Sequence, residues 1–168
     1  KNLIITGNTV VDACFRHLEI AKKRGFDEQS LKELDIENMD NILTLTMHRA
    51  ENVDVEERVT SIIGALNELS DMNIIFPIHP RTKNTLENFG LFDELNDLEH
   101  VHIVKPIGYL DFLLLTSKST LILTDSGGLQ EEAPEDASGK LHWSPGHKIE
   151  SSLWRREMVG SLPDRRDP

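Results

Sequence analysis

Four short apolar runs, each closed by a polar or turn-forming cluster, constrain the fold of this chain more than any other feature. Uninterrupted apolar runs of this length predict strands that are buried on both faces, as in a parallel sheet covered by helices. The runs span residues 42–47, 73–78, 101–104 and 121–124.

Segments with helical periodicity separate these runs and give the alternation that right-handed βαβ units require. We expect helices over residues 55–69, 82–89 and 109–117, and another that begins at residue 127. The sequence therefore predicts an α/β fold built on a doubly wound parallel sheet of at least four strands.

The two ends of the chain have different patterns. Residues 3–8 form an apolar run closed by a turn signal, and residues 9–24 have the spacing of a helix. Residues 26–41 are acidic and weakly periodic, which predicts a loop with a short helix. Residues 135–168 hold both tryptophans, show no strand period and carry equal numbers of basic and acidic residues, so we expect an irregular tail there.

Composition excludes several classes of protein. A chain of 168 residues predicts one domain with an appendage. Its net charge of −11 argues against a protein that wraps a nucleic-acid backbone. No apolar run approaches the roughly 18 residues that span a bilayer. Cys14 is the only cysteine, which excludes an internal disulfide and a cysteine-based zinc site and favours a reducing, cytoplasmic setting.

Each predicted strand is followed at once by polar or turn-forming residues. Open α/β sheets bind ligands in the crevice beyond the carboxyl ends of their strands. Because clusters follow four consecutive strands, they predict a ligand site at this edge of the sheet. The clusters begin at His48, His79, Pro106 and Asp125.

Two of these clusters contain groups suited to phosphate, and each has a plainer alternative. The Ser-Gly-Gly turn at residues 126–128 either presents free backbone N–H groups to a diphosphate or forms a strand-to-helix turn capped by Ser126. His48 and Arg49 suit phosphate recognition, and His48 can also move a proton. Alternatively, His48 bonds the backbone and Arg49 pairs with Glu51.

Other side chains near these strand ends are less decisive. Arg81 either contacts phosphate or simply begins its helix. Phe112 either stacks on a base or packs into the core. We expect Glu51, Glu131 and Glu132 to be the carboxylates nearest the site.

Several segments together resemble the signature segments of the non-hydrolysing UDP-N-acetylglucosamine 2-epimerases. They are residues 46–52 (TMHRAEN), 106–112 (PIGYLDF) and 123–134 (LTDSGGLQEEAP). Residues 5–13 resemble the segment that links the two domains of that family, and the form Pro-Ile-His-Pro-Arg-Thr resembles archaeal members. The resemblance implies the carboxyl-terminal, nucleotide-binding half of a two-domain fold like that of GT-B glycosyltransferases.

The resemblance also implies a reaction and a set of site residues. UDP-GlcNAc and UDP-ManNAc interconvert through elimination of UDP to a 2-acetamidoglucal and re-addition with inversion at C2, and this route needs no cofactor or metal. His48 matches the active-site histidine near the diphosphate, where it can stabilise the leaving UDP. The substrate-binding matches are Ser126, Gly127 and Gly128 on the diphosphate, Glu132 on the ribose, and Ile107 and Phe112 at the uracil.

Carried onto the chain, the resemblance divides it into three parts. Residues 1–25 match an interdomain linker helix region, residues 26–134 an incomplete UDP-sugar-binding domain, and residues 135–168 are atypical. We therefore expect a partial chain that binds UDP-GlcNAc or UDP but is inactive alone. We expect no nucleic-acid or membrane partner and leave a homodimer open. Half of a GT-B glycosyltransferase and a non-catalytic nucleotide-binding module remain as alternatives.

Overall fold

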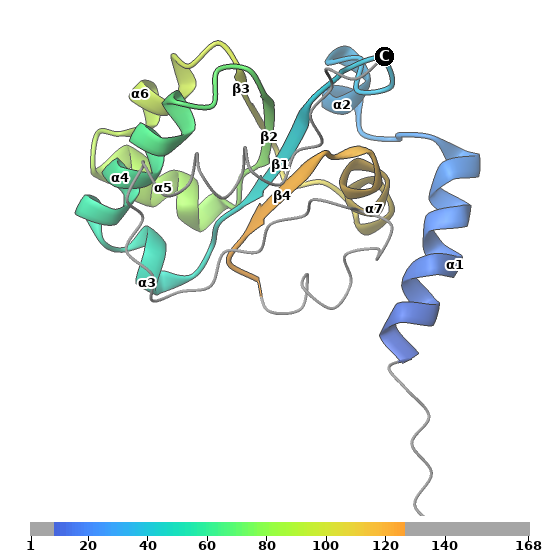
Figure 1. Ribbon diagram of the computed structural model, residues 1–168. Helices are drawn as coiled ribbons and strands as arrows, with labels where there is room; N and C mark the ends of the chain where they lie inside the picture. Colours follow the sequence, from blue (N-terminus) through green and yellow to red (C-terminus); the bar gives the residue numbers. More distant parts are fainter. Residues whose placement is uncertain (1–8, 127–168) are drawn as a thin grey trace, which may run out of the picture.

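The central element is a four-stranded sheet with the strand order β3-β2-β1-β4 (Figure 1). The computed structural model describes residues 9–126, and the side chains of residues 12–126. All three strand pairings are parallel, and each predicted strand is confirmed at its position. The strands are β1 Ile42–Thr46, β2 Asn73–Pro77, β3 Val101–Val104 and β4 Leu121–Thr124.

Strand β1 pairs with both β2 and β4, so the winding of the sheet reverses there. The chain runs outward from β1 to β2 and β3, and then crosses back to add β4 on the other side of β1. The register places Thr46 opposite Thr124, so β1 and β4 end together. Because the strands are parallel, His48, Pro106 and Ser126 follow strand ends at one edge of the sheet, as predicted.

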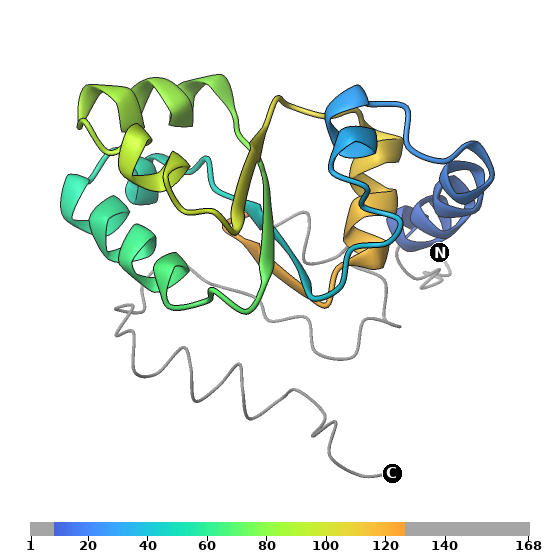
Figure 2. The ribbon, with the colours of Figure 1, turned by 90° about the horizontal axis from the view of Figure 1, so that it is seen from above.

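Helices cover both faces of the sheet, which confirms the doubly wound fold (Figure 2). Successive strand side chains point to opposite faces. Leu43 and Phe76 therefore belong to one hydrophobic core, and Ile42 and Ile75 to the other. On the first face lie α4 Glu56–Asn67, α5 Pro80–Asn88 and α6 Phe92–Asn96; on the second lie α1 Thr9–Arg24, α2 Gln29–Glu33 and α7 Tyr109–Lys118.

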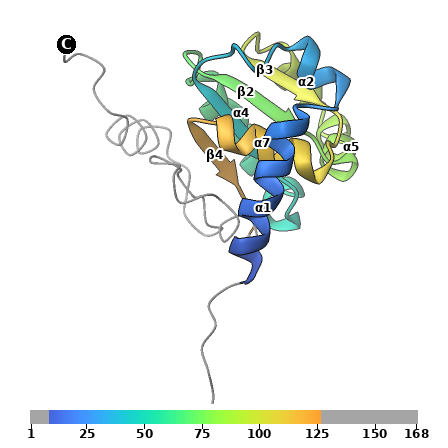
Figure 3. The ribbon, with the colours of Figure 1, turned by 90° about the vertical axis from the view of Figure 1, so that its right-hand side faces the viewer.

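Helix α1 packs along α7 on the outer side of the second face (Figure 3). Its buried stripe of Cys14, Leu18 and Ala21 follows helical spacing and faces inward. The helix ends at Arg24, and the next residue, Gly25, has a φ of 72°, which L side chains rarely adopt. The left-handed glycine turns the chain toward the sheet at this point.

A buried carboxylate on α7 fixes the turn that follows α1. Asp111 is 4% exposed and forms an ion pair with Arg24. It also accepts hydrogen bonds from the backbone N–H groups of Asp27 at 3.1 Å and Glu28 at 2.9 Å. These contacts tie the end of α1 to α7, so α1 is packed on the α/β unit; the boundary predicted near residue 25 stays a prediction.

The helices agree with the sequence patterns except where they are very short. The helix predicted over residues 9–24 is confirmed at both ends, and α2 is the short helix expected within residues 26–41. Helices α3 (Ala50–Val53) and α6 were not predicted, because elements of four and five residues show no periodicity. The expectations for residues 3–8, for a helix from residue 127 and for the tail lie outside the described residues.

No helix within residues 9–126 combines the length and the apolar character that crossing a membrane requires.

Candidate functional site

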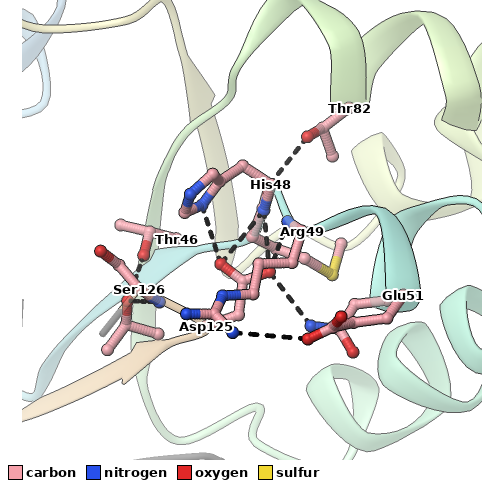
Figure 4. A network of polar contacts seen from close by, with 10 residues as sticks. Thr46, His48, Arg49, Glu51, Thr82, Asp125 and Ser126 are labelled. Atoms are coloured by element: carbon pink, nitrogen blue, oxygen red, sulfur yellow. Dashed lines mark hydrogen bonds and ion pairs between the residues drawn. The ribbon is translucent and has the colours of Figure 1, made fainter. Parts of the chain in front are cut away.

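The carboxylate of Asp125 is the centre of a hydrogen-bond network at the point where the winding of the sheet reverses (Figure 4). Its side chain is 0% exposed. It accepts from the backbone N–H groups of His48 at 3.0 Å and Arg49 at 2.8 Å, and from the side-chain amide of Asn52 at 3.1 Å. The His48 ring joins them, with Nδ1 2.8 Å from Asp125 Oδ1.

This network explains how the segment after β1 keeps its shape. Arg49 occupies the N-cap position of α3, and its own side chain makes no capping hydrogen bond. The first N–H groups of a helix lack intrahelical partners and need acceptors from elsewhere. Asp125 supplies an acceptor for the N–H of the N-cap residue Arg49, and for that of His48 before it, from the end of β4 across the strand pair. The loop after β1 is therefore held in place by the loop after β4.

His48 lies half in and half out of this network. Its side chain is 50% exposed, although Nδ1 faces the buried carboxylate. Nδ1 is therefore the ring nitrogen that lies within hydrogen-bond distance of the carboxylate. The other ring nitrogen, Nε2, has no partner within residues 12–126 and can act on a ligand as a proton donor or acceptor. Among the described residues the partner of the ring is the Asp125 side chain, and the structure shows no contact of the ring with the backbone there.

A pair of hydroxyls sets the start of the Ser-Gly-Gly turn. Thr46 and Thr124 face each other across β1 and β4, with their Oγ1 atoms 2.6 Å apart. Thr124 Oγ1 also accepts from the backbone N–H of Ser126 at 3.0 Å. Ser126 is half-buried and lies next to Asp125, so the first residue of the predicted diphosphate turn is close to His48. Its partners Gly127 and Gly128, and also Glu132, lie outside the described residues.

The arginines at this edge have acidic neighbours. Arg49 Nη1 lies 3.4 Å from Glu51 Oε1, which is the pairing set out as the plainer alternative. Arg81 pairs with Asp54 at 2.6 Å. All four side chains are more than 40% exposed, and such surface pairs contribute about 0–1 kcal/mol. These arginines can therefore exchange their present partners for an anionic ligand at little cost.

The cluster that begins at His79 forms the start of helix α5, which agrees with the alternative that Arg81 simply begins its helix. His79 is the N-cap of α5, and its Nδ1 accepts from the backbone N–H of Arg81 at 3.2 Å. Pro80 occupies the first helical position, where its missing N–H and fixed φ are favourable. Nδ1 of His79 therefore caps α5, whereas Nδ1 of His48 contacts a buried carboxylate.

The two residues predicted at the uracil lie further along the same edge. Ile107 follows β3, is half-buried and packs against the core between the sheet and α7. Its side chain packs against that core, and its contact with uracil stays a prediction. Phe112 is half-buried on α7. Neither residue joins the network around Asp125.

Among the described residues, the carboxylate that contacts the His48 ring is one that the sequence patterns missed. Glu51, Glu131 and Glu132 were expected to be the acidic groups at the site, and that expectation is wrong because Asp125 contacts the His48 ring directly. Its position immediately after β4 was the available signal. Asn52 was also missed; it is 1% exposed, and its Oδ1 has no partner among the described residues.

No group of three or more His, Cys, Asp or Glu side chains within residues 12–126 is arranged to hold a metal ion.

A parallel α/β sheet that reverses its winding between β1 and β4, with polar groups gathered beyond those strand ends, defines a class of domain that binds ligands at its switch point. Residues 1–136 match the model of the UDP-N-acetylglucosamine 2-epimerase family. The chain belongs to this family, as its sequence motifs predicted.

Relatives with known structures or curated functions agree with this assignment. The chain is 46% identical over 136 residues to the UDP-N-acetylglucosamine 2-epimerase of Methanocaldococcus jannaschii, a match of 79% of this chain and 37% of the relative. The corresponding enzyme of Methanococcus maripaludis is 45% identical over 137 residues, again 79% and 37%. The chain therefore spans 37% of the length of these relatives.

Solved structures of the family superpose on the fold. The UDP-GlcNAc 2-epimerase of Methanocaldococcus jannaschii matches with a TM-score of 0.72 at 39% identity, covering 94% of this chain and 42% of that one. The same enzyme in complex with UDP-GlcNAc and UDP matches with a TM-score of 0.68 at 41% identity, covering 84% and 38%. These neighbours have the GT-B-like fold, of which the present sheet is one half.

Proposed function

We propose that this chain forms the UDP-binding part of a UDP-N-acetylglucosamine 2-epimerase, with its site at the carboxyl ends of β1 and β4. The observation that supports this most is the junction of two family motifs. The His-Arg-x-Glu-Asn segment and the Asp-Ser-Gly-Gly turn are held together by the Asp125 carboxylate. The family match favours an epimerase over a glycosyltransferase, which was the alternative drawn from the fold.

Under this proposal the two sides of the junction share the work. Ser126, Gly127 and Gly128 hold the diphosphate through backbone N–H groups, which suit phosphate oxygens. His48 faces the same diphosphate through Nε2. When the bond between C1 and the UDP oxygen breaks, the electron pair goes to that oxygen, and a donor at Nε2 stabilises the charge that develops there.

The remaining contacts bind the nucleoside. Glu132 accepts from the ribose hydroxyls, and Ile107 and Phe112 lie at the uracil. Elimination and re-addition change the configuration at C2 without net oxidation or reduction, so the route calls for no nicotinamide cofactor. The same proposal makes residues 26–134 the UDP-sugar-binding domain and residues 1–25 the link to a second domain. It sets the reaction in the cytoplasm, in the supply of a sugar for polysaccharide synthesis; a homodimer stays a prediction.

Titration calorimetry of the 168-residue chain with UDP tests the proposal. We expect weak binding, because the site is built from one domain and each ~1.4 kcal/mol of missing contact lowers affinity tenfold. Ser126→Trp should abolish the heat of binding by filling the turn. Ser70→Trp is the matched control, since Ser70 is exposed and lies just before β2, at the opposite edge of the sheet.

Two results would contradict this assignment. If the wild-type chain gives no heat with UDP while remaining folded, the UDP site is not formed by these residues. If Ser126→Trp binds UDP as tightly as wild type, the turn after β4 is not the diphosphate site.

A further inference from the structure

The two oxygens of the Asp125 carboxylate have different partners. Oδ2 accepts from three nitrogens that always carry hydrogen: the backbone N–H groups of His48 and Arg49 and the side-chain amide of Asn52. Oδ1 faces Nδ1 of the His48 ring at 2.8 Å, with the His48 backbone N–H as a longer contact at 3.2 Å. Oδ2 therefore holds the loop after β1 in place, and Oδ1 contacts the imidazole of His48.

This division fixes where the ring keeps its proton. A neutral imidazole has one N–H and one lone pair, and either nitrogen can hold the proton. The tautomer with its lone pair on Nδ1 would place that lone pair against a carboxylate oxygen, which is repulsive. The tautomer protonated at Nδ1 gives a hydrogen bond in the same place. A burial of 100% for the Asp125 side chain denies the carboxylate a competing water partner.

We propose that Asp125 is a positioning residue for His48: its buried carboxylate keeps the proton on Nδ1 and so makes Nε2 the single ring nitrogen that acts on the ligand. Nε2 accepts a proton when the ring is neutral and donates when the ring is an imidazolium. The carboxylate compensates the positive charge of that imidazolium, as the aspartate of a serine-protease triad does. The nature of the ligand, a nucleotide-sugar diphosphate, rests on the proposed function; the placement of the proton does not.

Asp125 could instead serve only to cap α3, and the replacement Asp125→Asn separates the two roles. The asparagine oxygen should occupy the Oδ2 position, because three donors converge there. Its amide nitrogen then occupies the Oδ1 position and points N–H at the His48 ring. Nδ1 must become the acceptor, so the ring proton moves to Nε2. The loop keeps its acceptor while the tautomer reverses.

Two-bond proton–nitrogen NMR spectra of the ¹⁵N-labelled 168-residue chain report the tautomer directly. In alkaline buffer we expect Nδ1–H for His48 in the wild type and Nε2–H in Asp125→Asn. The chain has seven histidines, and the signal that disappears in His48→Gln identifies the right one. Finding Nε2–H in the wild type, or an unchanged tautomer in Asp125→Asn, would overturn the proposal.

The chain offers a matched control for the substitution itself. Asp111 is also a buried carboxylate that accepts from two backbone N–H groups, and the described structure shows no imidazole among its partners. Asp111→Asn should therefore leave the His48 signals unchanged. Should Asp125→Asn not fold, Asn52→Ala removes one donor at Oδ2 and retains the carboxylate. It must keep the Nδ1–H tautomer, and a reversed tautomer there would refute the proposal.

The test is independent of the proposed ligand. The tautomer is measured without nucleotide, whereas the UDP site is tested by calorimetry. A wild-type chain that shows Nδ1–H but binds no UDP would retain the positioning role and lose the proposed function. A chain that binds UDP and shows Nε2–H would retain the proposed function and refute the positioning role of Asp125.

Discussion

Removing the Asp125 carboxylate altogether should destabilise the fold as well as the site. Asp125→Ala leaves three nitrogens without their acceptor: the backbone N–H groups of His48 and Arg49 and the amide of Asn52. Each buried donor that loses its partner costs about 1–3 kcal/mol. The half-exposed His48 ring can turn to water and adds little.

The total loss of stability in Asp125→Ala should be smaller than three times the full penalty for an unpaired buried donor. The two backbone groups are only partly buried and gain some hydration, whereas Asn52 is 1% exposed and gains none. We expect a loss of about 2–5 kcal/mol, which is a large part of the about 5–15 kcal/mol that stabilises an ordinary domain. With a urea m-value of about 2 kcal/mol/M, a loss of about 3 kcal/mol moves the unfolding midpoint down by about 1.5 M.

Urea unfolding followed by circular dichroism measures this loss. Asp54→Ala is the control, because Asp54 pairs with Arg81 on the surface, with side chains 43% and 54% exposed. Its removal should cost about 0–1 kcal/mol. If Asp125→Ala shifts the midpoint no more than Asp54→Ala does, the network does not hold the loops together and the reasoning fails.

Three further predictions test the backbone, the pH dependence and the chemistry. Gly25→Ala should lower the free energy of unfolding in urea by about 1 kcal/mol, because the φ of Gly25 is 72°. Gly64→Ala is the control: Gly64 lies inside α4, has equally no neighbours within 4 Å of an added Cβ, and its replacement should raise that free energy by about 0.5–1 kcal/mol. Burial, and secondarily the nearby His100, lowers the pKa of His102 below its ordinary 6.5, so the unfolded chain takes up this proton first. Stability should therefore fall as pH drops below about 6.5; a curve of urea midpoint against pH as steep in His102→Gln as in wild type would contradict this. The 168-residue chain alone should not convert UDP-GlcNAc to UDP-ManNAc, because epimerisation needs acid–base groups on both faces of the sugar. NMR of the anomeric protons checks this, and product formation that His48→Ala abolishes would show that these residues suffice.

The strands were predictable because burial on both faces of a parallel sheet demands unbroken apolar runs. The runs at residues 101–104 and 121–124 coincide with β3 and β4 at both ends. The longer helices were predictable because their buried stripes follow the helical period, as Cys14, Leu18 and Ala21 do in α1. Helices α3 and α6 left no such trace, since a single turn has no period to detect.

The edge at which the site lies also followed from the sequence. Parallel strands end on one side, so polar clusters after each strand had to meet there. This reasoning identified His48 and Ser126 and the polar clusters to which they belong. It did not find the partner of His48, because a strand end contains several polar residues and the sequence does not say which of them is buried.

The sequence by itself determined the class of fold, the family and the edge of the sheet where the candidate site lies, since local patterns and motifs encode all three. Only the tertiary structure decided that β4 lies beside β1, because the pairing of strands depends on how the crossover through α7 packs. That pairing brings Asp125 to His48 across 77 positions of sequence. Because a buried carboxylate needs hydrogen-bond partners, Asp125 accepts from the backbone of the loop after β1. Its contact with the imidazole orients the ring of His48.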